Sequence, residues 1–107
     1  MKPEDRLIQE SPLYQGADEQ VNYSLTSTPW GSTPTSVVAK IYLIDSGTYT
    51  DYSTTCFGAT TSTVTGDVIS LPTVQNIVSG NRYRMEVKFT DSGGNIWEPY
   101  VIIEGQR

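Results

Sequence analysis

The residues that could carry chemistry in this chain are few. The sequence of 107 residues has no histidine and a single cysteine, Cys56. A Ser-His-Asp triad, a Cys-His pair and a histidine-bearing zinc site all need an imidazole, and an all-thiolate zinc site needs several cysteines. The Gly-x-x-x-x-Gly-Lys-Ser/Thr pattern of a phosphate-binding loop is absent from the sequence. We therefore expect no enzyme activity, no resident metal and no cofactor.

Paired carboxylates are the remaining catalytic option. Asp45 and Asp51 flank a short loop, and Asp18 and Glu19 are adjacent. Glycosidases use two carboxylates about 5–10 Å apart, usually in a cleft that raises one pKa. A β-domain of this size seldom forms such a cleft, so solvated loop charge is the expected interpretation of both pairs.

Calcium is a second option for the acidic residues, since oxygen ligands from Asp91, Asn95 and Asp45 would suit it. The loop from Asp91 to Asn95 lacks the alternating acidic residues of known calcium loops. We expect Asp91 to accept hydrogen bonds from its own turn instead.

The aromatic residues point to binding. Six of them, Trp30, Tyr42, Tyr49, Tyr52, Trp97 and Tyr100, cannot all lie in one small core. Exposed Tyr and Trp favour protein contacts or sugar stacking. We expect Trp30 and Trp97 to cover the ends of the fold, and we predict that Tyr49, Tyr52 and Tyr100 contribute to a partner surface. Indoles exposed beside polar groups would favour the alternative, a carbohydrate-binding or adhesin-type module.

Composition and charge narrow the class of partner. The net charge of −5 and the scattered Lys and Arg residues disfavour nucleic acid and membrane surfaces. A lone Cys56 forms no intrachain disulfide, which suits a reducing cytoplasm or a particle assembled there. Neither a secretory signal nor a membrane-spanning run is visible, so we expect the virion or the bacterial cytoplasm as its location.

The elements that must position these residues are strands. The chain holds 14 Thr and 11 Ser and is rich in Val, Ile and Tyr, which favours β-structure. Residues 36–44 form the most apolar run, typical of a central strand covered on both faces, with Ala39, Ile41 and Leu43 inward. Residues 48–57 read as one or two short exposed strands. Pro99 predicts a bend or an edge in the final strand.

The C-terminal third carries the clearest pattern. Residues 82–90 alternate, with Tyr83, Met85, Val87 and Phe89 predicted to face inward. Residues 91–95 predict a hairpin loop. We expect one all-β domain over residues 13–107, a single antiparallel sandwich of about seven strands. We expect residues 1–12 to be a frayed N-terminal segment, in which residues 5–10 could add a short edge strand.

Two apolar residues, Val74 and Ile77, and the turn glycine Gly80 come before the alternating residues 82–90, and Tyr83 follows Gly80 by three residues. This arrangement resembles the tyrosine corner of fibronectin type III and immunoglobulin-like sandwiches, which implies a structural role for Gly80, Tyr83, Met85, Val87 and Phe89. The Tyr hydroxyl in such a corner bonds back to the backbone just upstream.

The whole chain resembles the small immunoglobulin-like proteins of tailed phages and prophages. The likeness is carried by residues 16–18, Trp30, residues 80–84, the glycine-rich hairpin at 91–95 and the final apolar strand at 100–104. It implies a non-catalytic head–tail or tail adaptor component of a virion, whose partners are neighbouring virion proteins or further copies of itself. Residues 48–63 and 97–100 depart from the family pattern.

Overall fold

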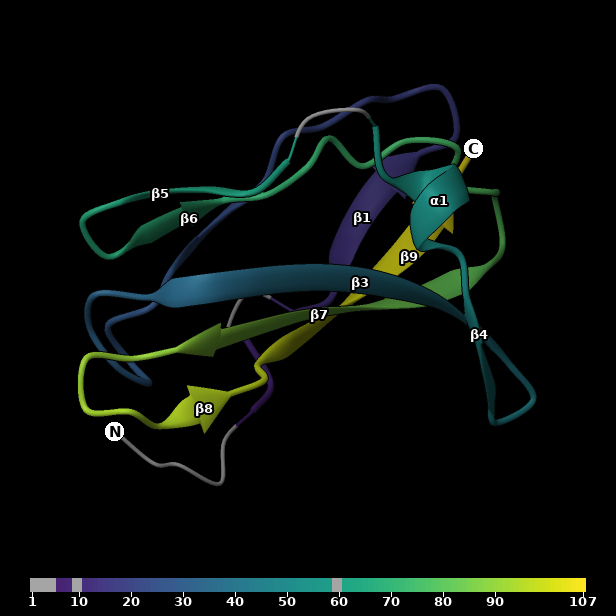
Figure 1. Ribbon diagram of the computed structural model, residues 1–107. Coiled ribbons are helices and arrows are strands. Elements are labelled where there is room, and N and C mark those ends of the chain that lie inside the picture. The colour runs from purple at the N-terminus through teal and green to yellow at the C-terminus, as the bar shows by residue number, and fades with distance from the viewer. Residues whose placement is uncertain (1–5, 9–10, 59–60) are drawn as a thin grey trace.

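The computed structural model describes residues 6–8, 11–58 and 61–107. These residues form two β-sheets packed face to face, with one short helix at one end (Figure 1). The prediction of an all-β sandwich-like fold is therefore confirmed. The strands are more numerous than the seven expected, because several are only two or three residues long.

The larger sheet supplies most of the structure. Its strand order is β1-β9-β7-β3-β4, and a short strand β8 pairs with β7 beyond the start of β9. The strands are β1 (Leu13–Gly16), β3 (Thr35–Asp45), β4 (Thr48–Asp51), β7 (Arg82–Thr90), β8 (Ile96–Trp97) and β9 (Tyr100–Gln106). All pairs are antiparallel except β1 with β9, which is parallel. The expectation of a purely antiparallel sandwich was wrong at this edge.

The smaller sheet covers one face of the larger one, as Figure 1 shows. Its order is β2-β6-β5, from β2 (Ser24–Thr26), β6 (Val68–Ser70) and β5 (Thr63–Thr65). Leu25 and Ile69 are its buried residues opposite each other in the ladder. The core lies between the two sheets.

The core follows the predicted alternation. Tyr83, Met85, Val87 and Phe89 are all at most 1% exposed, and Ile41 is fully buried, with Ala39 and Leu43 packed against the core. Successive strand residues point to opposite faces, so the intervening residues of β3 and β7 must face away from the small sheet. This second face carries the candidate functional site.

The tight turns fall where the sequence places them. Ser46 and Gly47 both have positive φ, of 51° and 82°, in the two-residue loop between β3 and β4. Such loops match the twist of the strands that they join. Residues 91–95 join β7 to β8 as predicted. The extended strand is then interrupted around Pro99, between β8 and β9. Because β9 lies between β1 and β7, the break at Pro99 is a bend, and β9 is not an edge strand.

Residues 53–56 correct a second expectation. The segment predicted as exposed strand contains β4 and then a one-turn helix, α1 (Ser53–Cys56). The Asp51 carboxylate accepts a hydrogen bond from the Ser53 backbone N–H at 2.8 Å, and the Tyr52 carbonyl accepts from Cys56 N–H at 2.8 Å. These local hydrogen bonds outweigh the strand preference of Thr54 and Thr55.

The expected N-terminal edge strand is described only at residues 6–8. Leu7 forms a parallel bridge with Tyr100, and the Ile8 N–H donates to the Tyr100 carbonyl at 2.8 Å. Residues 1–5 and 9–10, which were expected to be frayed, lie outside the described residues.

Tyr83 makes the contact that the tyrosine-corner resemblance implies. Its ring is fully buried, and its phenolic oxygen accepts a hydrogen bond from the Val78 backbone N–H at 3.0 Å. Gly80, with φ of 87°, forms the turn between them and donates its N–H to the Gly105 carbonyl. The corner therefore joins the segment before β7 to the end of β9.

Tyr83→Phe should lower the free energy of unfolding by about 1 kcal/mol, because the Val78 N–H loses its acceptor. Urea denaturation would measure the change. Tyr14→Phe is the matched control, because Tyr14 is 63% exposed. Equal stability of the two variants would contradict a structural role for the Tyr83 hydroxyl.

Candidate functional site

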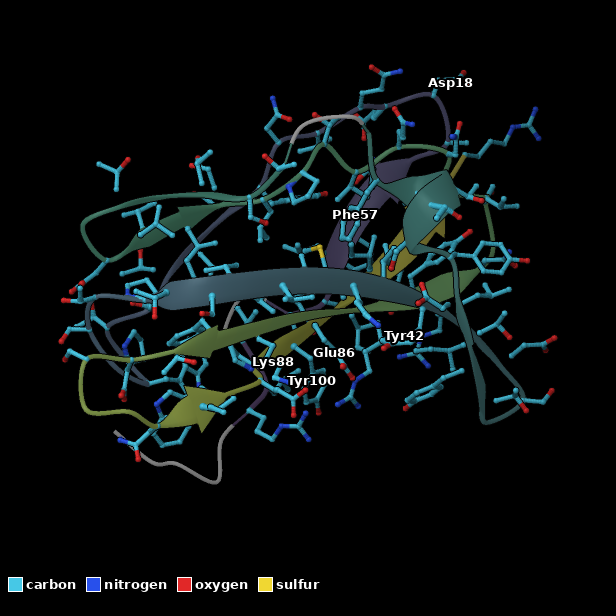
Figure 2. All side chains as sticks on the ribbon, in the orientation of Figure 1. Asp18, Tyr42, Phe57, Glu86, Lys88 and Tyr100 are labelled. Carbon is cyan, nitrogen blue, oxygen red and sulfur yellow. The ribbon has the colours of Figure 1, made fainter. Side chains whose placement is uncertain are left out.

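The face of the large sheet that points away from the small sheet is the candidate site. We call it the outer sheet face. Side chains on it alternate with the buried residues of β3, β7 and β9 and continue onto the flanking strands. It comprises Tyr14, Val38, Lys40, Tyr42, Ile44, Tyr49, Arg82, Arg84, Glu86, Lys88, Tyr100, Ile102 and Glu104. Figure 2 shows Tyr42, Glu86, Lys88 and Tyr100 projecting from this face.

The apolar run of β3 was expected to be covered on both faces, and this was wrong. The small sheet covers the inner face alone, while Val38 is 49% exposed on the outer one. Tyr49 is 50% and Tyr14 63% exposed on neighbouring strands. Thus a strand with the composition of a doubly covered strand presents its second face to solvent.

Arg84 organises the centre of this face. Its guanidinium carbon lies 3.8 Å from the ring centroid of Tyr100 and 5.6 Å from that of Tyr49. Its Nε donates to the Glu86 carboxylate at 2.8 Å. Tyr42 contacts Tyr49, with ring centroids 6.5 Å apart. We call Tyr42, Tyr49, Arg84, Glu86 and Tyr100 the Arg84 cluster.

The side chains of the Arg84 cluster are held in place by their contacts with one another. The Arg84 side chain is only 15% exposed and that of Glu86 21%. Stacking on aromatic rings and a charge-assisted hydrogen bond fix the plane of the guanidinium. Immobilised Tyr and Arg side chains lose little conformational freedom on binding, which is why such residues dominate binding energy at interfaces.

Two of the three predicted partner-surface residues meet in this cluster. Tyr49 and Tyr100 both contact Arg84 from strands on opposite sides of β7. Tyr52 does not join them, because it follows β4 beside inward-facing Ile41 and packs against the core. The odd spacing between Tyr49 and Tyr52 already places them on opposite faces of an extended chain.

Arg84 and Tyr42 were not among the predicted site residues. Arg84 was expected to face outward from the alternating strand, and Tyr42 was counted among the aromatic residues and in an apolar run, but neither was assigned to the partner surface. Their role depends on the register that sets Tyr42 opposite Arg84 and Arg84 opposite Ile102. A single sequence shows the alternation within each strand, but it does not show which strands are neighbours.

A shallow groove adjoins the cluster. It has a volume of about 270 Å³ and is lined by Val38, Lys40, Tyr42, Glu86, Lys88 and Glu98. Drug-sized ligands occupy larger and more apolar cavities.

The basic residues gather on this side of the molecule. Of the six Lys and Arg residues that the structure describes, all except Arg107 lie on the outer sheet face or beside it. Arg6 lies beside it, with its guanidinium 5.7 Å from the Tyr100 ring centroid and its Nε donating to the Glu98 carbonyl. Among the described residues, the outer sheet face and its border therefore hold five cationic side chains and four carboxylates (Asp51, Glu86, Glu98 and Glu104). The net charge of the whole chain is −5. The rest of the surface is correspondingly acidic.

The two indoles pack on the core. Trp30 and Trp97 are both half-buried against it. The Trp97 Nε1–H donates to the Asp91 carboxylate at 2.8 Å. Both positions agree with the expectation that these rings cover the fold, and neither ring is presented as an open stacking platform for sugar.

Asp91 accepts hydrogen bonds within its own loop, as expected. Besides Trp97, its carboxylate accepts from the backbone N–H groups of Gly93 and Asn95, each at 2.9 Å. These hydrogen bonds hold the pKa of Asp91 below its ordinary value of 3.8, and the bond from Trp97 has the largest effect. Asp45 lies at the opposite end of β3, so the three oxygen ligands proposed for calcium do not meet. Among residues 6–8, 11–58 and 61–107, no group of three or more acidic or cysteine side chains is placed to hold a metal ion.

The lowered pKa of Asp91 predicts a loss of stability in acid. The folded protein keeps the Asp91 carboxylate ionised at a lower pH than the unfolded chain does. The contribution of this carboxylate to the free energy of unfolding is therefore complete above its pKa in the unfolded chain, and it disappears as the pH falls through its pKa in the folded protein. We expect the urea midpoint to fall between about pH 5 and about pH 3, and to fall less in Asp91→Asn. Asp18→Asn, at an exposed turn, is the control. An unchanged acid profile in Asp91→Asn would contradict this assignment.

The carboxylate pairs are part of turns. Asp45 is the last residue of β3 and Asp51 the last residue of β4, and they face Thr48 and Tyr42 respectively in the ladder. The Ser53 side chain and, to a smaller extent, the Ser53 backbone N–H donate hydrogen bonds to Asp51 and lower its pKa. A carboxylic acid that acts as a general acid needs a raised pKa instead. Glu19 accepts from the Gly16 N–H at 2.6 Å.

Cys56 is fully buried, and burial raises the pKa of its thiol.

Comparison of this chain with protein-family models, curated proteins and solved structures finds no match. In the part of the chain that the structure describes, no helix has the length and apolar character needed to cross a membrane. The function of the chain must therefore be inferred from the outer sheet face itself.

Proposed function

We propose that this chain is a non-catalytic protein-interaction domain of a phage or prophage virion, which docks onto a neighbouring virion protein through its outer sheet face. The observation that carries the proposal is the Arg84 cluster on a face whose apolar residues the small sheet leaves uncovered. The sequence resemblance to immunoglobulin-like phage adaptors supports the choice of a virion as its location.

The chemistry of the face favours protein over sugar. Tyr and Arg are enriched at protein interfaces, and the rim of an interface is polar. On the outer sheet face, Arg82 and Glu104 form an ion pair at 3.9 Å. A carbohydrate-binding module would expose an indole, whereas Trp97 packs on the core and donates its N–H to Asp91.

Incorporation into particles tests this proposal. Particles purified from the encoding host should contain the chain, and a Tyr49→Ala, Tyr100→Ala double variant should be incorporated at least tenfold less. The control is Thr65→Ala with Val68→Ala, a facing pair on the small sheet. Melting temperatures of both variants separate lost docking from lost folding. Absence of the chain from particles, or equal incorporation of the two double variants, would refute the proposal.

A further inference from the structure

The larger sheet ends in two edge strands, and one of these edges is open. The strand path ends at β1 on one side and at β4 on the other (Figure 1). At β1, the Gly16 N–H donates to the Glu19 side chain, and the Gly16 carbonyl accepts from the Glu19 N–H. The turn after β1 therefore occupies part of that edge, whereas all four residues of β4 are exposed.

The backbone of β4 presents hydrogen-bonding groups on its free side. The Tyr52 N–H donates to the Ile41 carbonyl at 2.9 Å, so Tyr52 bonds to β3. Successive residues of an antiparallel pair alternate in this respect. The even-numbered residues of β4 therefore bond to β3 as well, while Tyr49 and Asp51 point their N–H and C=O groups away from it. Over the described ranges 6–8, 11–58 and 61–107, these outward groups have no partner in another element.

Such an edge is a template for a further strand. Proteins usually protect exposed edges with Lys, Pro or a bulge, and β4, with the sequence Thr-Tyr-Thr-Asp, has none of these. In recognition by strand addition, backbone hydrogen bonds give affinity and alternate side chains give specificity. Tyr49 belongs both to the free edge and to the Arg84 cluster, so an added strand would extend the outer sheet face.

We infer that a segment of the partner protein adds to β4 as an antiparallel strand, with an apolar residue facing Tyr49 and a cationic residue facing Asp51. The antiparallel direction lets each facing pair exchange both of its backbone hydrogen bonds. The two residues of the segment are two positions apart and therefore lie on one face, the outer one. This inference rests on the proposed docking function and specifies what the partner contributes to it.

The side chains of β4 select the two residue types. The Tyr49 ring is 50% exposed although it contacts Tyr42 and Arg84, so an apolar residue opposite it would cover the exposed part. Asp51 also lies on the outer face, opposite Tyr42. Lys40 is diagonal to Asp51 across the ladder, but among the described residues Asp51 forms no ion pair within 4.0 Å. Its carboxylate is therefore open to a cation of the added strand.

Hydrogen exchange in purified particles tests the added strand directly. We expect the amides of Tyr49 and Asp51 to exchange about tenfold more slowly in particles than in the free chain, because they gain acceptors. The Val64 amide, on the exposed edge strand β5 of the small sheet, is the control and should exchange equally in both. Equal rates at Tyr49 and Asp51 would overturn the inference. Slower exchange of these amides in the free chain as its concentration rises would identify a second copy as the occupant and would also refute it.

Tyr49→Pro and Tyr49→Val separate the backbone from the ring. Both variants lack the ring, but only proline removes the outward N–H, and an edge strand accepts proline where that N–H faces solvent. We expect Tyr49→Pro to be incorporated into particles about fivefold less than Tyr49→Val, the effect of one hydrogen bond. Melting temperatures report whether both variants fold, and hydrogen exchange of the unsubstituted chain decides the question if Tyr49→Pro does not. Equal incorporation of two folded variants contradicts strand addition.

Asp51→Asn tests the cationic residue of the partner. Asparagine keeps an acceptor for the Ser53 N–H but removes the charge. We expect incorporation about fivefold below that of the unsubstituted chain, because a charge-assisted hydrogen bond is lost. Asp45→Asn makes the same change in net charge at the end of β3 and should stay within about twofold. Equal incorporation of Asp51→Asn and Asp45→Asn would reject the cation.

Strand addition and the docking function fail in different ways. Suppose that Tyr49→Ala with Tyr100→Ala abolishes incorporation, while Tyr49→Pro matches Tyr49→Val and the amides of Tyr49 and Asp51 exchange as in the free chain. The docking face then stands, and strand addition is rejected. If the Tyr49→Ala, Tyr100→Ala variant is incorporated as well as its small-sheet control, the docking function is rejected and strand addition with it.

Discussion

Gly105→Ala is expected to lower the free energy of unfolding by about 3 kcal/mol, near the upper end of what overpacking a core usually does. A Cβ at this position would overlap the Val78 carbonyl oxygen and would lie 3.0 Å from a methyl group of Ile77. The obstacle is backbone and has little freedom to move, because the Gly105 N–H donates to Asn81 and its carbonyl accepts from Gly80. The methyl group must therefore separate β9 from the turn that supports Tyr83.

Gly93→Ala is the matched control for this prediction. Its Cβ would meet Asp91 at 3.4 Å, an ordinary contact in an exposed loop. Urea denaturation of both variants would measure the difference. A Gly105→Ala protein as stable as Gly93→Ala would show that the end of β9 does not pack against residues 77–78 in this way.

Arg84→Ala is expected to weaken docking about 30-fold, which corresponds to about 2 kcal/mol for a central interface residue. The substitution removes the group on which Tyr100 and Tyr49 both stack and leaves Glu86 without its partner. The fold should persist, because the side chain lies on the outer sheet face and not in the core.

Arg82→Ala is the control within the same strand and on the same face. Its side chain is 58% exposed, and its ion pair with Glu104 is long at 3.9 Å. Exposed pairs of this kind contribute little. Quantitative mass spectrometry of purified particles would give the ratio of variant to wild-type chain. Equal incorporation of Arg84→Ala and Arg82→Ala would reject a special role for the stacked guanidinium.

The larger sheet is well predicted from sequence where the signal is local. The alternation of β7, the loop at 91–95 and the bend at Pro99 each depend on residues close together in the chain. Tyr83 is also a local signal, because its partner Val78 is five residues away.

Other features depend on contacts that a single sequence does not show. The parallel pairing of β1 with β9 joins residues about 90 apart, such as Leu13 with Ile103. The helix α1 forms because one side chain, Asp51, satisfies the Ser53 N–H, against the strand preference of its neighbours. The outer face of β3 was expected to be covered because its composition matches a doubly covered strand, whereas among the described residues the small sheet covers only the inner face.

The sequence predicted only part of the candidate site, because the site combines residues from several strands whose order a single sequence does not show. Tyr49 and Tyr100 were identified as exposed aromatic residues. Arg84, which contacts both rings, could be recognised only once the strand order β9-β7-β3-β4 was known. Tyr52 was grouped with Tyr49 and Tyr100 because a count of aromatic residues does not assign each one to a face, and its ring packs against the core.

Site-specific photo-cross-linking in assembled particles tests the docking face most directly. A photoreactive phenylalanine analogue would replace Tyr49, Tyr100 or, as a control, Val68 on the small sheet, which is 38% exposed. We predict that positions 49 and 100 cross-link to one and the same virion protein, while position 68 yields no such product. Cross-linking from position 68 with none from positions 49 and 100 would show that this domain uses its other face.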